Sequence, residues 1–400
     1  MHSQGRVLVG GVILLIGLSV LACSLGGQAP ATATATAAPT DSPAPSPSPV
    51  PATATLPPPT ATATLQPPTA TAATATPATP ATAAATGAPL LVVAAPDNKT
   101  VGLVTLDGQA RPLAQAPATI YVGGYAIGPQ GEQPLSFVGT SASSVVVYTG
   151  PAAPQGIVAW ISLTTSVTST VKTQQIHVAA LDGSNARVVL EEQITDHVLS
   201  VMRWSPDGKR LYYSKEPLGL GGPSIMFSGF SNLWSLDLAS GKSAQIVMYT
   251  AQRTICLDDF TADAGLVGEH CAHNAPPYHN VIDLLSPSSG AITLIQPPPG
   301  LPFQQLGDVR FSPDETRVAY ALGNPDSQQG WVAVSDGLTG GSHLVATPPH
   351  GDFYHVMAWL DNNTLILQAA ITPGVWLVQA DGANLHRVAD GTFLGVMRGP

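Results

Sequence analysis

Two short patterns recur along this 400-residue chain, and their spacing constrains the fold more than any other feature. The first pattern is an aromatic residue, a short polar turn containing Asp, and a β-rich run; its copies begin at Trp204, Phe260, Phe311 and Trp359. The first copy reads Pro-Asp-Gly at its turn, where Pro presets φ, Asp bonds to the local backbone and Gly tolerates positive φ. Each copy therefore predicts a β-hairpin.

The second pattern is a pair of apolar runs joined by a polar turn that holds Gly. It occurs six times, at residues 101–113, 176–190, 233–247, 281–295, 331–345 and 375–388. From the second copy onward the turns recur about every 45 to 55 residues, and we assign the longer first interval to an insertion around residues 162–173. Six copies predict six units.

Units of four short antiparallel strands without helical periodicity are typical of a β-propeller. Segments 204–213 and 311–320 resemble the aromatic-Ser-Pro-Asp-Gly repeat of TolB-type propellers, the bacterial WD-repeat-like group. We therefore expect an all-β, six-bladed β-propeller over residues 89–400, with residues 392–397 completing the first blade. The resemblance implies protein or peptide partners that are reached through the channel mouth or the top loops.

The N-terminal residues have the layout of an export signal. Arg6 supplies one positive charge and is followed by an apolar run of roughly 16 residues. A membrane-spanning helix needs about 20 apolar residues, so an anchor helix with a buried cysteine is the less favoured alternative. The run ends in Val20-Leu21-Ala22-Cys23, which resembles the bacterial lipobox. We therefore expect a lipoprotein signal peptide at residues 1–22 and a mature protein that is lipid-anchored through Cys23 to the outer face of the cell membrane.

Residues 23–88 predict a disordered tether. One charged side chain, Asp41, stands within residues 28–88 among almost nothing but Ala, Thr, Pro and Ser. Such a segment has too few large apolar groups to offset the entropy of ordering. In the polyproline II conformation, which rises about 3.1 Å per residue, it would reach more than about 100 Å.

Two cysteines, Cys256 and Cys271, remain once Cys23 carries lipid. An exported chain with an even remainder is expected to pair them, and their midpoint falls within the turn at residues 262–265. A disulfide across this hairpin would stabilise the fold by about 3 kcal/mol. The alternative is a zinc site that adds nearby histidines to these cysteines, namely His270, His273 and His279. No paired C-x-x-C or H-x-x-x-H spacing supports it, so we predict no metal site.

Several function classes find no support in the sequence. It has neither a G-x-S-x-G stretch nor a G-x-x-x-x-G-K-[ST] phosphate loop, so we predict no catalytic residues and no cofactor. The net charge of −10 and the lack of a basic run argue against a nucleic-acid partner.

The innermost strand of each blade lines the channel of a propeller, and here these strands should end at the motif aromatics. Counting back one to four residues gives the candidate channel-facing binding residues Arg203, Asp258, Asp259, Asp308, Arg310 and His355. Such mixed charges suit a small polar ligand or a peptide terminus, and they suit ion pairs between blades equally well. We therefore expect a non-catalytic protein- or ligand-binding module. One alternative is a propeller lyase or glycosidase that acts on surface glycans with this set's carboxylates and His355 as acid and base. Another is a ligand sensor in which residues 162–173 cover the channel.

Overall fold

The computed structural model describes residues 87–399 except 140–141, 154, 166–171, 219–226, 228, 249–256 and 271–280. The predicted signal peptide, Cys23, residues 23–86 of the predicted tether and the predicted Cys256–Cys271 disulfide lie outside these residues.

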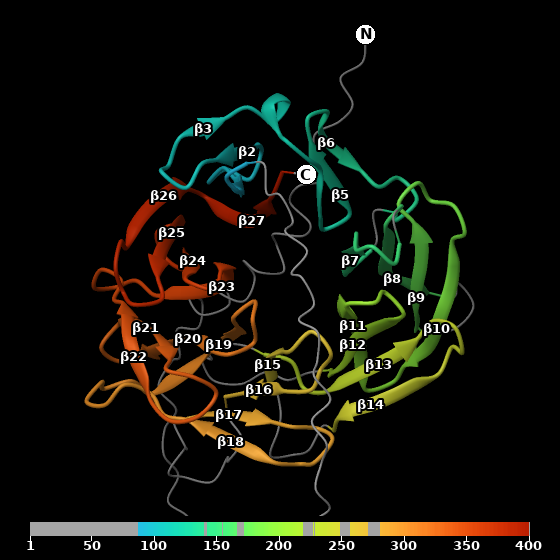
Figure 1. Ribbon diagram of the computed structural model, residues 1–400. Helices are drawn as coiled ribbons and strands as arrows, with labels where there is room; N and C mark the ends of the chain where they lie inside the picture. Colours follow the sequence, from blue (N-terminus) through green and yellow to red (C-terminus); the bar gives the residue numbers. More distant parts are fainter. Residues whose placement is uncertain are drawn as a thin grey trace, which may run out of the picture. The chain divides into compact units, whose positions relative to one another are not determined.

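The described residues form seven antiparallel sheets, which we call blades 1 to 7 in chain order (Figure 1). Blade 1 contains, in sheet order, β27 (Thr392–Met397), β1 (Leu90–Ala94), β2 (Val101–Val104) and β3 (Ala110–Arg111). The 3₁₀ helix η1 (Leu113–Gln115) follows β3. Blade 2 contains β4 (Ile120–Val122), β5 (Tyr125–Gly128) and β6 (Gly131–Pro134). Blade 3 contains β7 (Val145–Tyr148), β8 (Ile157–Thr165), β9 (Lys172–Ala180) and β10 (Arg187–Ile194).

The remaining four blades each have four consecutive strands. Blade 4 contains β11 (His197–Trp204), β12 (Arg210–Pro217), β13 (Leu233–Asp237) and β14 (Ser243–Val247). Blade 5 contains β15 (Leu257–Phe260), β16 (Val267–Glu269), β17 (Ile282–Leu285) and β18 (Ile292–Ile295). Blade 6 contains β19 (Gln305–Phe311), β20 (Val318–Asn324), β21 (Gln329–Ser335) and β22 (Ser342–Ala346). Blade 7 contains β23 (Tyr354–Asp361), β24 (Thr364–Ala369), β25 (Gly374–Gln379) and β26 (His386–Asp390).

The predicted all-β propeller is confirmed, but the predicted number of six blades is wrong, because the structure has seven. The blade that the sequence did not reveal is blade 2. Its three strands are only three or four residues long and it has no fourth strand among the described residues. The long first interval between repeats therefore holds a short blade, and residues 162–165 and 172–173 belong to the long strands β8 and β9.

The two ends of the described chain meet in blade 1. Strand β27 pairs antiparallel with β1, from Leu90 opposite Met397 to Ala94 opposite Thr392. The expected completion of the first blade by residues 392–397 is confirmed. This pairing covers the edge of β1 and closes the ring.

Motif turns of the predicted kind join the two inner strands in blades 4, 5 and 6. Gly208, Ala264 and Glu315 stand at the same position of these turns and have positive φ angles of 66°, 59° and 58°. A left-handed residue at this point is what the Pro-Asp-Gly pattern predicts.

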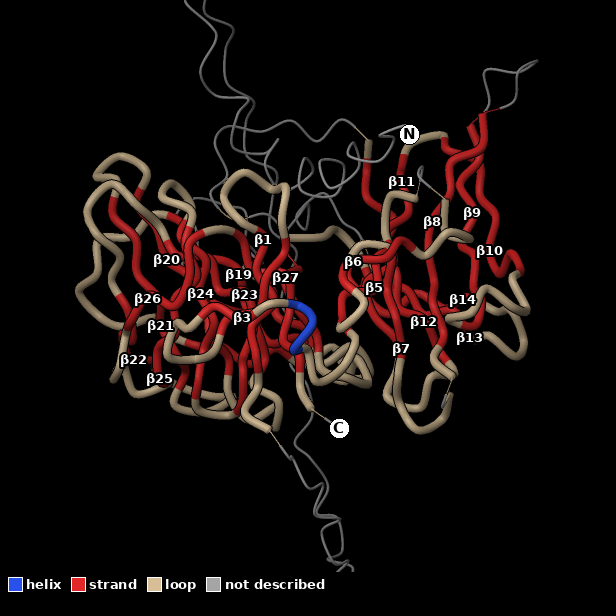
Figure 2. Tube along the Cα trace, turned by 90° about the horizontal axis from the view of Figure 1, so that it is seen from above, coloured by secondary structure: helices blue, strands red, loops and turns tan. Residues whose placement is uncertain are grey.

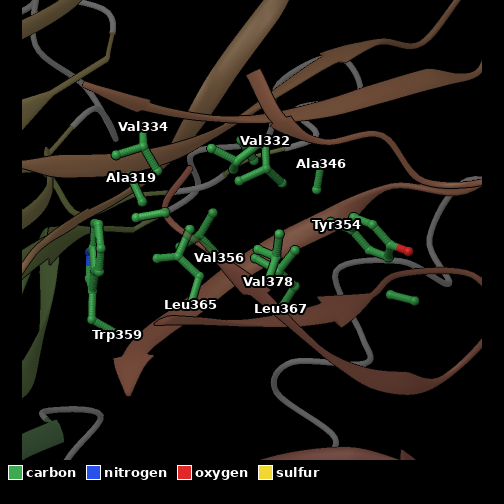
Figure 3. Packing of buried hydrophobic residues seen from close by; sticks show 14 of the residues in the cluster. Ala319, Val332, Val334, Ala346, Tyr354, Val356, Trp359, Leu365, Leu367 and Val378 are labelled. Carbon is green, nitrogen blue, oxygen red and sulfur yellow. The ribbon is translucent and has the colours of Figure 1, made fainter. Parts of the chain in front are cut away.

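The hydrophobic core lies between neighbouring blades, as Figure 3 shows for blades 6 and 7. Val332 and Val334 of β21 face Val356, Leu365 and Leu367 of blade 7 in this cluster. Seen from above, the strands run between two faces that carry the loops (Figure 2). Each blade buries one face against the next, so no blade has a complete core of its own.

Candidate functional site

The candidate site is built by the innermost strands of blades 4 to 7, which lie nearest the centre of the ring (Figure 1). Each of these strands has a register shift just before its motif aromatic residue. The shifts fall between Val201 and Arg203, Leu257 and Asp259, Gly307 and Arg310, and Val356 and Ala358. Such a β-bulge adds a residue to one strand and redirects side chains.

Because of these bulges, consecutive residues rather than alternate ones line one cavity of about 430 Å³. Met202 and Arg203 contribute from β11, and Asp258 and Asp259 contribute from β15. The other lining residues are Ser200, Val201, Phe260, Arg310, Phe311, Pro313, Met357, Ala358 and Trp359. The cavity therefore combines four charged side chains with methionine and aromatic side chains.

Asp259 links three blades. Its carboxylate forms an ion pair with Arg203 of blade 4 and accepts a hydrogen bond from the backbone N–H of Phe311 in blade 6 at 3.1 Å. The Arg203 guanidinium also lies over the ring of Phe260, 4.0 Å from its centroid. Asp259 Oδ1 also accepts a hydrogen bond from the Phe260 N–H at 2.8 Å, so both oxygens of the Asp259 carboxylate have partners.

Asp258 is paired with a histidine of its own blade. Its Oδ2 lies 2.6 Å from His270 Nδ1, and its Oδ1 accepts the backbone N–H of Asp308 at 3.1 Å. Burial opposes a charged imidazole here, but the Asp258 carboxylate outweighs it and raises the pKa of His270. The pair is almost inaccessible to solvent, since the side chains are 9% and 1% exposed.

Asp308 and His355 form a similar pair between blades 6 and 7. Asp308 Oδ2 lies 2.7 Å from His355 Nδ1. Burial opposes the charged imidazole, but the hydrogen bond that His355 donates to the Asp308 carboxylate outweighs it and raises the pKa of His355. Asp308 sits within the bulge of β19 and has a positive φ of 53°. Its backbone thus adopts a conformation that Asp tolerates better than most residues.

Arg310 differs from the other charged residues of the cavity. Its Nη1 donates to Val309 O at 2.8 Å and to Asp258 O at 3.4 Å, and its Nε donates to Met357 O at 3.4 Å. Within the described part of the chain it forms no ion pair. Arg310 is therefore held by carbonyl oxygens of its own strand β19 and of the neighbouring strands β15 and β23.

The structure brings together the six residues that were predicted from the sequence, but it divides them into two sets. Arg203, Asp258, Asp259 and Arg310 line the cavity, whereas Asp308 and His355 are absent from its lining and pair with each other. That these residues bind a ligand stays a prediction.

Sequence reasoning missed Met202, Met357 and the pairing of His270 with Asp258. The Asp258–His270 pair does not follow from the register of the hairpin, because Leu257 lies opposite Glu269 and Asp259 opposite Gly268, with Asp258 at the bulge between them. The methionines carry no signal either, because their place in the lining depends on the bulges.

The described residues contain no cluster of three or more His, Cys, Asp or Glu side chains that could hold a metal ion. In the same part of the chain, no helix has the length and apolar character that crossing a membrane requires.

No protein-family model matches the sequence, and no curated protein matches it. Solved structures that are similar to this chain include an oligogalacturonate lyase from Vibrio parahaemolyticus, with 12% identity and a TM-score of 0.45 over 75% of this chain and 79% of that chain. They also include a putative TolB from Agrobacterium tumefaciens, with 13% identity and a TM-score of 0.35 over 78% of this chain and 90% of that chain. At such identities these similarities concern the fold and not the activity.

Proposed function

We propose that this chain is an exported lipoprotein whose propeller binds a protein or a small polar ligand and catalyses no reaction. The observation that carries this proposal is that the three candidate carboxylates, those of Asp258, Asp259 and Asp308, are already engaged. Asp259 pairs with Arg203, Asp258 with His270 and Asp308 with His355. A lyase or glycosidase needs groups that are free to exchange protons with the substrate.

The histidines support the same conclusion. The pKa values of His270 and His355 are raised although burial opposes the charged form, because the Asp258 and Asp308 carboxylates stabilise it. Each imidazole is also held against its carboxylate by a hydrogen bond, within blade 5 for Asp258–His270 and between blades 6 and 7 for Asp308–His355. We assign both pairs to holding the inner strands in place.

The proposed location rests on the lipobox-like segment that ends at Cys23. It is tested by expressing the full chain in a bacterial host that is fed an alkyne fatty acid. We expect labelling of the wild-type chain and its recovery with membranes, and we expect Cys23→Ser to lose both. A C23S chain that stays with the membranes would instead support an anchor helix.

Binding at the inner-strand cavity is tested by site-specific photo-crosslinking in the same cells. A photoreactive amino acid replaces Met357, which lines the cavity, or, as the matched control, Ser240, which is exposed in the β13–β14 turn. We expect a discrete adduct from position 357 and none from position 240. No adduct at position 357 would count against the proposal, as would glycan cleavage that is lost in Asp308→Asn.

A further inference from the structure

The charged residues directly before the motif aromatics do not all find an opposite charge at the same position of a neighbouring blade. The residue directly before the motif aromatic is Arg203 in blade 4, Asp259 in blade 5, Arg310 in blade 6 and Ala358 in blade 7. Arg203 and Asp259 form an ion pair with each other. The residue that follows Arg310 in this series, Ala358, carries no charge. Arg310 consequently has no carboxylate at the equivalent position of the next blade.

The remaining hydrogen-bonding capacity of this cavity is that of a donor. The oxygens of Asp258 and Asp259 are taken up by His270, Arg203 and backbone N–H groups. Arg310 uses Nη1 and Nε toward carbonyl oxygens, and in the described part of the chain its Nη2 donates no hydrogen bond. The two N–H groups of Nη2 therefore remain to donate to a carboxylate oxygen in a charge-assisted hydrogen bond.

The apolar side chains around Arg310 determine which kind of anion fits the cavity. Met202 and Met357 line the cavity, together with Phe311 and Trp359. Methionine side chains adapt to apolar groups of varied shape. A cavity of about 430 Å³ lies in the range of small-ligand sites, which is enough for one or two residues of a peptide and not for a folded surface.

We propose that this cavity binds the free C-terminal carboxylate of a peptide that ends in an apolar residue. Arg310 donates hydrogen bonds to the carboxylate, and Met202 and Met357 pack against the apolar side chain. This inference rests on the proposed binding function and names the chemistry of its ligand. An acidic sugar would offer the same carboxylate, but it would place hydroxyl groups against the methionines.

The first test uses the wild-type propeller with its tether and two probes that differ in one group. The probes are acetyl-Ala-Ala-Leu with a free carboxylate and the same tripeptide with a C-terminal amide, titrated by saturation-transfer NMR. We expect the carboxylate to bind about tenfold more tightly, as a charge-assisted hydrogen bond implies. Equal affinities would overturn the proposal, and so would D-galacturonate binding more tightly than the tripeptide acid.

A pair of variants then tests the role of Arg310 without removing it. Ala358→Asp supplies the missing carboxylate beside Arg310, and Ala358→Asn adds nearly the same volume without charge. We expect A358D to lower the affinity for the tripeptide acid to that for the amide, and A358N to keep the preference. If both variants lose the preference for the tripeptide acid over the amide, or if neither does, Arg310 does not bind the carboxylate. Arg310→Met should also lose this preference. Arg387→Met, which removes an ion pair with Asp390 outside the cavity, should keep it.

The outcomes separate this inference from the proposed function. If crosslinking at position 357 is unchanged in Arg310→Met, a partner binds there without the carboxylate contact, and only the present inference fails. If no partner crosslinks while the tripeptide acid binds through Arg310, the carboxylate site stands and the proposed partner does not.

Discussion

The Asp259 side chain joins three consecutive blades of the ring. It reaches Arg203 in blade 4 and the Phe311 N–H in blade 6 from its own place in blade 5. Asp259→Ala would leave both groups without this partner. Breaking a fully buried pair costs about 3–5 kcal/mol; since Arg203 is 37% exposed, we expect the free energy of unfolding in urea to fall by about 2 kcal/mol.

Asp390 offers a matched control, because its ion pair with Arg387 lies on the outer strand β26 and its side chain is 68% exposed. We expect Asp390→Ala to lower the free energy of unfolding by less than about 1 kcal/mol. If Asp259→Ala and Asp390→Ala lower the free energy of unfolding by the same amount, Asp259 does not join the blades in the way that its contacts indicate.

The two Asp–His pairs should make stability depend on pH. Burial opposes the charged imidazoles, but the carboxylates raise the pKa values of His270 and His355 above the ordinary value of about 6.5. A raised pKa in the folded state stabilises fully below the unfolded value and is lost as pH rises through the folded value. We therefore expect the free energy of urea unfolding to decrease as pH rises from about 6.5 upward.

Other groups near these histidines set the control for this pH profile. Glu269 and Asp308 raise the pKa of His270, whereas Arg310 lowers and Asp352 raises the pKa of His355. Burial lowers the pKa of His177, so its contribution has the opposite sign. Replacing His270 and His355 together by Gln should flatten the decrease. A double variant with the wild-type profile would show that these pairs are not its source.

The sequence located the charged side chains of the site but not their partners. Counting back from the motif aromatics found them because strand ends and turns have clear signals. Their pairing depends on which neighbouring strand each residue faces. A β-bulge before the aromatic residue changes the direction in which these side chains point. The residue types at the bulges, such as Met202 and Asp258, do not predict a bulge.

The motif turns of blades 4, 5 and 6 share one hydrogen-bond arrangement. In blade 6 the Ser312 hydroxyl donates to Asp314 Oδ1 at 2.6 Å and accepts the backbone N–H of Arg317 at 3.0 Å. Ser205 and Thr261 make the equivalent contacts with Asp207 and Asp263 in blades 4 and 5. The hydroxyl thus bridges the two strands, which explains why Ser or Thr recurs two residues before Asp.

Ser312→Ala should lower the free energy of unfolding by about 1–2 kcal/mol, because Ser312 is 1% exposed and its loss leaves a buried N–H without its acceptor. Urea denaturation measures this change. Ser288→Ala, in the exposed turn between β17 and β18, should change it by less than about 0.5 kcal/mol. A negligible loss in S312A would show that the recurrence of the hydroxyl has another cause.

The regular blades were predictable and blade 2 was not, for reasons that lie in their strands. Strands such as β12 and β20 were recognised because they follow the aromatic-Ser-Pro-Asp pattern, and each repeat ends in a turn with Asp or Gly. Strands β4, β5 and β6 are too short for alternation to be distinguished from a loop. In blade 2 the strand β6 reads Gly-Glu-Gln-Pro and is not apolar, so the count of paired apolar runs stopped at six.

Closure of the ring depends on a strand from the far end of the chain. Strand β27 pairs along the whole of β1, and Met397 is fully buried beside Leu90 and Val92. Without β27, the edge of β1 would expose unpaired backbone groups and a row of buried apolar residues. The other six blades would still have their strands, but blade 1 would be open at its inner edge.

Truncation after Gly391 removes β27 and should therefore destabilise the whole ring, not one blade. Uncovering several fully buried side chains costs about 5 kcal/mol or more, which is comparable with the total stability of many domains. We expect the truncated chain to aggregate or to unfold at much lower urea, as measured by circular dichroism and size-exclusion chromatography. Truncation after Met397 is the matched control, because it keeps β27 and removes only residues 398–400. If the chain ending at Gly391 unfolds like this control, blades 2 to 7 hold together without closure, and the pairing of β27 with β1 contributes little to the stability of the propeller.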